Sequence, residues 1–138
     1  MAILGLNAYH GDAAAALVRD GRLAAAIEEE RLNRSKHCAG FPALAARAVL
    51  DLAGTAPSEV EHVAISRDPR AHLGRKILVA LRRPGLAGQV RDRIANLGKV
   101  RGAAADLSRA LGAGASFRPR HHAVGHHRSH LASAFFVS

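Results

Sequence analysis

The dipeptide Asp20-Gly21 constrains the fold more than any other feature, because it stands between two short apolar runs, Ala13 to Val18 and Leu23 to Ile27. Glycine accepts the positive φ that a two-residue hairpin turn demands, so Asp-Gly in this setting predicts two antiparallel strands. Alanine alone favours a helix, but a helix over these residues would have to run through Asp20-Gly21. We therefore expect a hairpin.

The remaining periodicity predicts an α/β fold in which three consecutive strands are followed by alternating elements. The opening segment Ala2 to Asn7 is short and apolar, as expected of a buried strand. Phe41-Pro42 predicts the start of an amphipathic helix that ends at Gly54. We further expect strands at Val60 to Ile65 and His121 to Val124, and a last helix from about His126 to Phe136.

Positive charge is concentrated in the middle of the 138-residue chain. Between Arg67 and Arg120, 13 Lys and Arg residues stand against three Asp and Glu, whereas the remainder has seven against eight. Leu81, Leu107 and other apolar residues at helical spacing predict helices here. The segment could neutralise phosphates, but it has almost no aromatic side chains to stack on bases. A charged helix surface is the simpler interpretation, and nucleic acid is not the expected partner.

Two absences indicate a soluble cytoplasmic protein. No apolar stretch reaches the roughly 20 residues of a membrane helix, and no apolar secretory core follows a basic N-terminus, so we expect no membrane partner. Cys38 is the single cysteine and cannot form an internal disulfide. We interpret it as a small loop residue rather than a catalytic thiol.

The loop after the first predicted strand collects polar side chains, from Asn7 to Asp12. His10 could move a proton near neutral pH, Asp12 could orient it, and backbone N–H groups of such a loop can hold a phosphate. A polar loop without chemistry is the alternative.

A second charged stretch runs from Glu28 to His37. Arg34, Lys36 and His37 could hold a phosphate or carboxylate through charge-assisted hydrogen bonds. A solvated turn of alternating charge is the alternative interpretation.

Five of the nine histidines lie between His121 and His130. In a helix that starts near His126, the side chains of His126 and His130 share one face, where two imidazoles can bind one divalent metal ion. A third ligand must come from elsewhere, and the Glu that completes the zincin pattern is missing. The cluster could also be structural.

In this order and separation, the motifs resemble the O-carbamoyltransferases of the nodulation and antibiotic-tailoring type. The resemblance rests on Ile3-Leu4-Gly5-Leu6-Asn7, His10-Gly11-Asp12-Ala13, Asp20-Gly21-Arg22-Leu23, Glu28-Glu29-Glu30-Arg31, Asn33-Arg34, Lys36-His37, Gly40-Phe41-Pro42 and the segment from His126 to Phe135.

The resemblance implies the first subdomain of a ribonuclease-H-like fold, shared with actins, sugar kinases and heat-shock ATPases, in βββαβα order. The sheet would be mixed and carry a helical insertion at about 67–112. Residues 1–138 would then be the N-terminal portion of a catalytic domain and truncated relative to the family. A C-terminal domain of such proteins makes carbamoyl-adenylate from carbamoyl phosphate and ATP. The N-terminal domain moves the carbamoyl group to a hydroxyl of a small-molecule acceptor.

The resemblance also implies site residues. His126 and His130 would hold a divalent metal, Fe²⁺ or else Zn²⁺, whose third ligand is an Asp beyond Ser138. The catalytic base would lie in the loop with His10 and Asp12, although some family members have His where this chain has Gly11. The charged stretch containing Arg34, Lys36 and His37 would lie near the cleft that binds ATP and carbamoyl-adenylate.

Two other interpretations stay open: a small basic nucleic-acid-binding module, and a truncated product that catalyses nothing. Steeply salt-dependent affinity for nucleic acid would favour the first. Because a truncated chain would leave an apolar face exposed, we expect self-association or a partner chain that supplies the missing C-terminal part.

Overall fold

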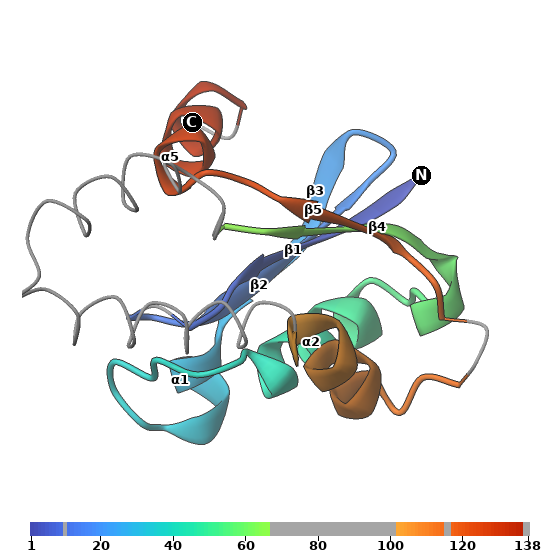
Figure 1. Cartoon of the computed structure of the whole chain (residues 1–138), viewed down its shortest axis with the longest axis horizontal. Coiled ribbons are helices and arrows are strands. Elements are labelled where there is room, and N and C mark those ends of the chain that lie inside the picture. Colours follow the sequence, from blue (N-terminus) through green and yellow to red (C-terminus); the bar gives the residue numbers. More distant parts are fainter. Residues whose placement is uncertain (10, 67–101, 115–116, 137–138) are drawn as a thin grey trace, which may run out of the picture.

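A mixed five-stranded sheet is the centre of the computed structural model, which describes residues 1–9, 11–66, 102–114 and 117–136 (Figure 1). The strand order is β3-β2-β1-β4-β5. β1 pairs antiparallel with β2, and β2 with β3, whereas β1, β4 and β5 are parallel to one another. The strands are β1 (Ala2–Asn7), β2 (Ala14–Arg19), β3 (Arg22–Glu28), β4 (Val60–Ile65) and β5 (Arg120–Ala123).

The predicted hairpin is confirmed. Asp20 and Gly21 have φ angles of 51° and 78°, the two positive values that a tight turn between twisted strands requires. Arg19 and Arg22 are register partners beside the turn. The N-terminal ammonium of Met1 also donates to Asp20 Oδ1 at 2.7 Å, which ties the turn to the start of β1.

One face of the sheet carries the hydrophobic core. Leu4, Leu17 and Val63 alternate along their strands with more exposed residues and are completely buried. Helix α2 (Ala43–Leu52) and a helix over residues 102–111 cover this face, as the green and brown coils in Figure 1 show. Their contribution to the core comes mainly from Ala45, Ala46, Val49, Leu50, Ala103 and Leu107.

The opposite face of the sheet has small side chains at its centre. Gly5, Ala14, Ala16, Ala26 and Ala64 occupy its centre, and helix α5 (His126–Phe136) lies on this side of the sheet, next to the end of β5 (Figure 1). α5 and β5 match the predicted helix and fifth strand. Small side chains leave a shallow floor, because they fill little of the space above the strands.

A short helix that the sequence did not predict, α1 (Glu29–Asn33), follows β3. Glu29 is only 5% exposed, and its two carboxylate oxygens accept the backbone N–H groups of Leu44 and Ala45 at 3.1 and 2.7 Å. A carboxylate at a helix N-terminus satisfies donors that have no partner within the helix. Glu29 therefore caps α2 and does not belong to a solvated turn.

The remaining predictions concern the middle of the chain. Residues 102–111 are helical, as the spacing of Leu107 and Leu111 predicted, and a 3₁₀ turn, η1 (Pro57–Glu59), precedes β4. The helices predicted between residues 67 and 101 lie outside the described residues. Among the helices that the structure describes, none is long and apolar enough to cross a membrane.

Candidate functional site

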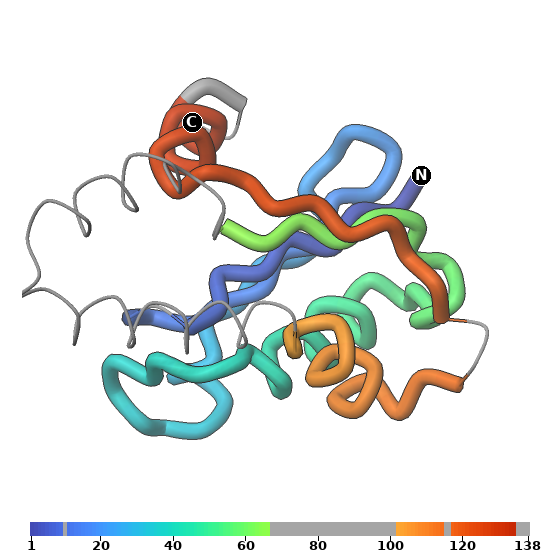
Figure 2. The backbone as a smooth tube through the Cα atoms, in the orientation of Figure 1, coloured from blue at the N-terminus to red at the C-terminus, as the bar shows by residue number. Residues whose placement is uncertain are grey.

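Two loops lie side by side at one end of the sheet, the one that follows β1 and the one that follows α1 (Figure 2). The backbone N–H of Tyr9 donates to the carbonyl of Gly40, and that of Ala13 to the carbonyl of Cys38, both at 2.9 Å. These two bonds hold Tyr9 and Ala13 against the loop of residues 34–42. The polar loop that follows β1 and the charged stretch that ends at His37 therefore lie next to each other.

Backbone strain is concentrated in these loops. Tyr9, Asp12, Arg34 and His37 have φ angles between 56° and 61°, although none of them is glycine. The left-handed region costs such residues roughly 1 kcal/mol or more each, and it persists only where the surroundings impose it. Strain of this kind gathers at functional sites, which makes these loops the first candidate for chemistry.

Asp12 and His37 meet across the two loops. Asp12 Oδ1 lies 3.1 Å from His37 Nδ1, and both side chains are exposed. The backbone N–H of His37 donates to Glu30 Oε2 at 3.3 Å, which anchors the residue to α1. A carboxylate that accepts the Nδ1 proton fixes the tautomer in which Nε2 can accept a proton. His10, the other predicted proton carrier, lies outside the described residues.

Arg34 and Lys36 lie in the same loop, with their side chains exposed. Among the described residues, neither side chain forms an ion pair, whereas Arg31 lies 3.3 Å from Glu28 Oε2 and 3.8 Å from Glu30 Oε1. The loop next to Asp12 thus presents two cations without a carboxylate partner in this part of the chain. Such groups can bind an anionic ligand.

Tyr9 joins this site to the core, a role that the sequence did not reveal. Its hydroxyl donates to Asp106 Oδ2 at 2.7 Å, and Arg109 Nη1 lies 3.0 Å from the other oxygen of that carboxylate. Burial, followed by the hydrogen bond to Asp106, raises the pKa of Tyr9 above its ordinary value. The loop after β1 is therefore fastened to the helix over residues 102–111.

The predicted pair His126 and His130 comes together on α5. Their Nε2 atoms are 3.1 Å apart, and the rings meet at 87° with centroids 4.5 Å apart. Two nitrogens that each lie ~2.1 Å from one ion are separated by such a distance when they subtend roughly 100° at it. The same separation also matches a hydrogen bond between two neutral imidazoles. Among the described residues no three His, Cys, Asp or Glu side chains are grouped closely enough to hold a metal ion.

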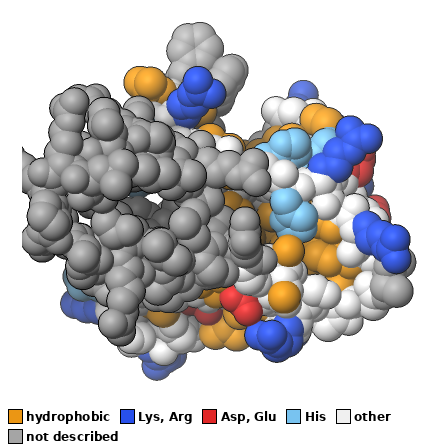
Figure 3. Space-filling view, viewed as in Figure 1, with side chains coloured by type: hydrophobic (Ala, Val, Ile, Leu, Met, Phe, Trp, Pro, Cys, Tyr) orange, Lys and Arg blue, Asp and Glu red, His pale blue; other side chains and the backbone are white. Residues whose placement is uncertain are grey.

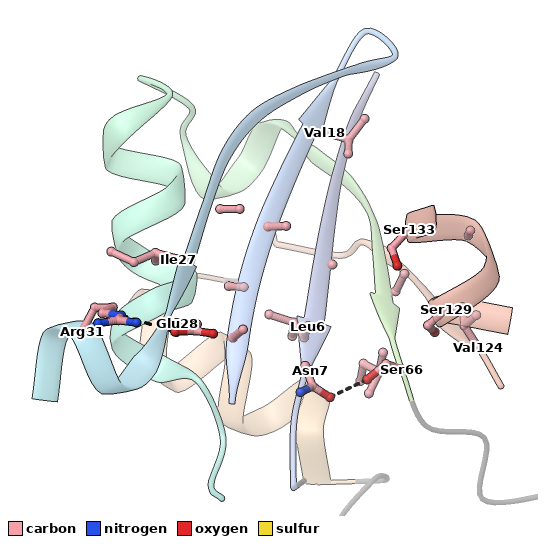
Figure 4. Close-up of a pocket in the computed structure, with 18 residues that line it drawn as sticks. Leu6, Asn7, Val18, Ile27, Glu28, Arg31, Ser66, Val124, Ser129 and Ser133 are labelled. Atoms are coloured by element: carbon pink, nitrogen blue, oxygen red, sulfur yellow. Dashed lines mark hydrogen bonds and ion pairs between the residues drawn. The ribbon is translucent and has the colours of Figure 1, made fainter. Parts of the chain in front are cut away.

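A hollow of about 830 Å³ lies over the alanine-lined face of the sheet (Figure 4). Figure 4 shows Arg31 and Glu28 on one side of it and Ser129 and Ser133 of α5 on the other. Asn7 lies at its end, where its side chain accepts a hydrogen bond from the hydroxyl of Ser66 at 2.8 Å and donates one to the carbonyl of Asp12 at 2.9 Å.

Asn7 thereby connects the hollow to the loop that contains Asp12. The Asp20-Gly21 turn predicted that the alanine-rich run Ala13 to Val18 is a strand, but the sequence gave no sign of an open face, because the cavity depends on what packs above it.

The family model for the carbamoyltransferase N-terminus matches residues 2–138. Over 67 residues the chain is 45% identical to the uncharacterized protein sll1178 of Synechocystis, a match that covers 49% of this chain and 11% of that protein. The chain is 45% identical over 58 residues to nodulation protein NolNO of Sinorhizobium fredii, and this match covers 42% of this chain and 8% of that relative.

A third relative is an uncharacterized 19.2 kDa protein from the syrM 5′ region of Rhizobium etli. The chain is 41% identical to it over 58 residues, 42% of this chain and 34% of the relative. The matches thus span about a tenth of the length of the first two relatives and about a third of the length of the third relative.

Proposed function

The chain belongs to the carbamoyltransferase N-terminal family, and from this premise we propose that it carries part of a site that transfers a carbamoyl group to a hydroxyl. Membership implies small-molecule substrates such as carbamoyl phosphate. The observation that carries the proposal is the junction of the two loops, which brings Asp12 within 3.1 Å of His37 beside two exposed cations. The substrates proposed are a small hydroxylated acceptor and carbamoyl-adenylate, made from carbamoyl phosphate and ATP in the cytoplasm.

The strand order supports a finer classification of the fold. Three antiparallel strands followed by two parallel ones, in the order β3-β2-β1-β4-β5, are what we expect of the first subdomain of a ribonuclease-H-like protein. We propose that residues 1–138 are this subdomain and form the N-terminal portion of a longer catalytic unit. In that arrangement the remaining ligands of the site come from the other portion.

Asp12 and His37 would carry the proton transfer. The acceptor oxygen attacks the carbamoyl carbon, a new C–O bond forms, and the bond from that carbon to the phosphate oxygen of AMP breaks. The proton of the hydroxyl passes to Nε2 of His37, whose other nitrogen is held by Asp12. His10 is the alternative base that the family resemblance favours, with Asp12 again as the group that orients it.

Arg34 and Lys36 would bind the adenylate phosphate next to that base. The two side chains lie in the loop of His37, and charge-assisted hydrogen bonds from a guanidinium and an ammonium match the oxygens of a phosphate. Their positive charge would also stabilise AMP as the leaving group. His37 itself is then both near the phosphate and near the reacting hydroxyl.

His126 and His130 would hold a divalent metal, Fe²⁺ or Zn²⁺, through their Nε2 atoms. When bound, such an ion acts as a Lewis acid toward a phosphoryl or carbonyl oxygen. The chain's own contribution is to place both imidazoles on one face of α5 with the separation that a shared ion requires. The third ligand would come from outside the described residues.

Binding of AMP to the 138-residue chain tests the proposed nucleotide site. We expect the double variant Arg34→Ala/Lys36→Ala to bind AMP at least tenfold more weakly by isothermal titration calorimetry. Arg22→Ala, which removes an exposed cation beside the hairpin turn, is the matched control and should bind like the unmodified chain. No AMP binding at all, or equal losses in both variants, would contradict the proposal.

The rate of AMP release from carbamoyl-adenylate tests the transfer step, with a polyol such as glycerol as the acceptor. Asp12→Asn should slow the release that the chain promotes by at least tenfold, because Asn cannot hold the imidazole with a charge. Asp20→Asn, at the far hairpin turn, should leave the rate unchanged. If the two variants release AMP equally fast, Asp12 has no part in the reaction.

A further inference from the structure

We propose that His62 and His122 form a second cation site, which binds Zn²⁺ or Cu²⁺ and fastens strand β5 to strand β4. His62 Nδ1 and His122 Nε2 are 3.0 Å apart, with ring centroids separated by 5.1 Å. The two residues are 60 positions apart in the chain. His122 belongs to the histidine-rich segment from His121 to His130, but neither residue was a predicted site residue. The spacing is nearly that of the pair His126 and His130, which lies on a helix.

The strands place both rings on one face of the sheet. His62 alternates with the core residue Val63, and His122 is the register partner of Ala64, so both lie on the face opposite the core. His62 is half-buried and His122 is exposed, which leaves the nitrogens within reach of a cation and of the water that would complete its coordination. Figure 3 shows histidine side chains reaching the surface of the molecule between hydrophobic ones.

His121 does not belong to this site. It is the register partner of Val63 and therefore lies toward the other face. Burial, followed by the charge of His122, lowers its pKa below the ordinary value for histidine. The strand β5 thus sends one of its two histidines to each face, and only His122 meets His62.

The two histidine pairs are separate sites. Among the described residues no group of three His, Cys, Asp or Glu side chains is close enough to share one metal ion. Each pair therefore offers two protein ligands within the described part of the chain. For His62 and His122 we propose that water completes the coordination, whereas the third ligand of His126 and His130 would come from outside the described residues. A hydrogen bond between two neutral imidazoles is the competing explanation for each short separation, since one ring can donate N–H to the other.

The ligands select the kind of cation. Imidazole nitrogen suits Zn²⁺, Cu²⁺ and Ni²⁺, whereas Ca²⁺ and Mg²⁺ require oxygen ligands. Arg120 is the register partner of His62 and adds positive charge on the same side of the sheet. That charge weakens the binding of every divalent cation equally, so the preference for Zn²⁺ or Cu²⁺ over Ca²⁺ and Mg²⁺ comes from the imidazole ligands.

The position of the pair gives the cation a mechanical role. β5 has four residues, pairs with β4 at the edge of the sheet, and is followed by α5 after two residues. An ion between His62 and His122 would hold β5 in register and thereby fix the start of α5. Occupancy of this site should therefore raise the thermal stability of the chain, whether or not the chain transfers carbamoyl groups.

Zn²⁺ titration by calorimetry tests the inference in the double variant His126→Ala/His130→Ala, which we call the background variant because it lacks the histidine pair on α5. The chain should bind two Zn²⁺ ions, and His126→Ala/His130→Ala should bind one. Adding His62→Gln or His122→Gln to that background should weaken the remaining site at least tenfold, whereas adding His127→Gln, an exposed histidine on α5, should not. Zinc should raise the midpoint of thermal unfolding of the background variant, and this rise should disappear with His122→Gln.

Several results would overturn the inference. One is a background variant that binds no Zn²⁺, and another is binding that survives both His62→Gln and His122→Gln. A stoichiometry of one ion per two chains would assign the metal to a contact between copies instead. Circular dichroism confirms that each variant is folded, and His122→Asn replaces His122→Gln if the latter is not. If only the site of His62 and His122 binds zinc, this inference holds and the proposed metal site at His126 and His130 fails.

Discussion

The two faces of the sheet are built from different kinds of side chain. The face under α2 presents Leu4, Leu17 and Val63, all completely buried, whereas the opposite face presents glycine and alanine beneath an open hollow. Large apolar side chains stabilise the fold because they bury apolar surface away from water, whereas small side chains leave unfilled space above the strands. The difference places most of the stabilising apolar packing on the first face and leaves open space over the second.

Lys and Arg side chains do not form a single charged patch on the face that Figure 3 shows. Outside the grey atoms of Figure 3, Lys and Arg side chains are scattered on the visible face instead of gathered in one patch. Arg34 and Lys36, the cations of the proposed phosphate site, lie together because they belong to one loop and not because they are part of a large charged surface. The comparison of the two faces gives three predictions for stability.

Truncation of a core leucine should have the largest effect. Leu17→Ala should lower the free energy of unfolding by about 2–5 kcal/mol, because it leaves a cavity against α2. The next residue, Val18, lines the open hollow, and Val18→Ala should cost less than about 1 kcal/mol. Urea unfolding measures both, and equal losses would mean that the second face is packed as tightly as the first.

Loss of the buried cap should have the next largest effect. Glu29→Ala leaves the N–H groups of Leu44 and Ala45 without acceptors and should cost about 1–3 kcal/mol. Glu61→Ala removes an exposed carboxylate 3.5 Å from the N-terminal ammonium and should cost less than about 1 kcal/mol. Equal costs in urea unfolding would show that Glu29 does not hold α2.

The loop anchor should have the smallest effect and a distinct pH dependence. The pKa of Tyr9 is raised on folding, so its contribution to stability is complete below the unfolded value of about 10 and is lost as the pH rises above it. Tyr9→Phe should cost about 1 kcal/mol at neutral pH and reduce the loss of stability above pH ~10. An unchanged alkaline profile would show that folding does not raise the pKa of Tyr9.

The parts of the fold that sequence alone predicted are those that depend on neighbouring residues. Asp20-Gly21 predicted the hairpin, and the spacing of His126 and His130 predicted that both rings share one helix face. These signals are local, because the turn depends on two adjacent residues and the two histidines are only four positions apart.

Features that join distant parts of the chain were not predictable in the same way. Tyr9 and Asp106 are 97 residues apart, and His62 and His122 are 60 apart, so no local pattern connects them. The sequence placed Asp12 and His37 in two separate motifs, and the backbone bonds between the loops bring them together. The burial of Glu29 likewise depends on where α2 packs.

Backbone amide shifts on addition of AMP test the central claim most directly, because they show where the nucleotide binds. In ¹⁵N-labelled chain we predict that AMP shifts the resonances of residues 8–13 and 34–42 and leaves those of Asp20, Gly21 and the α2 residues unchanged. Shifts confined to residues outside these two loops, or none at millimolar AMP, would contradict the assignment of the carbamoyl transfer site to the junction of Asp12 and His37.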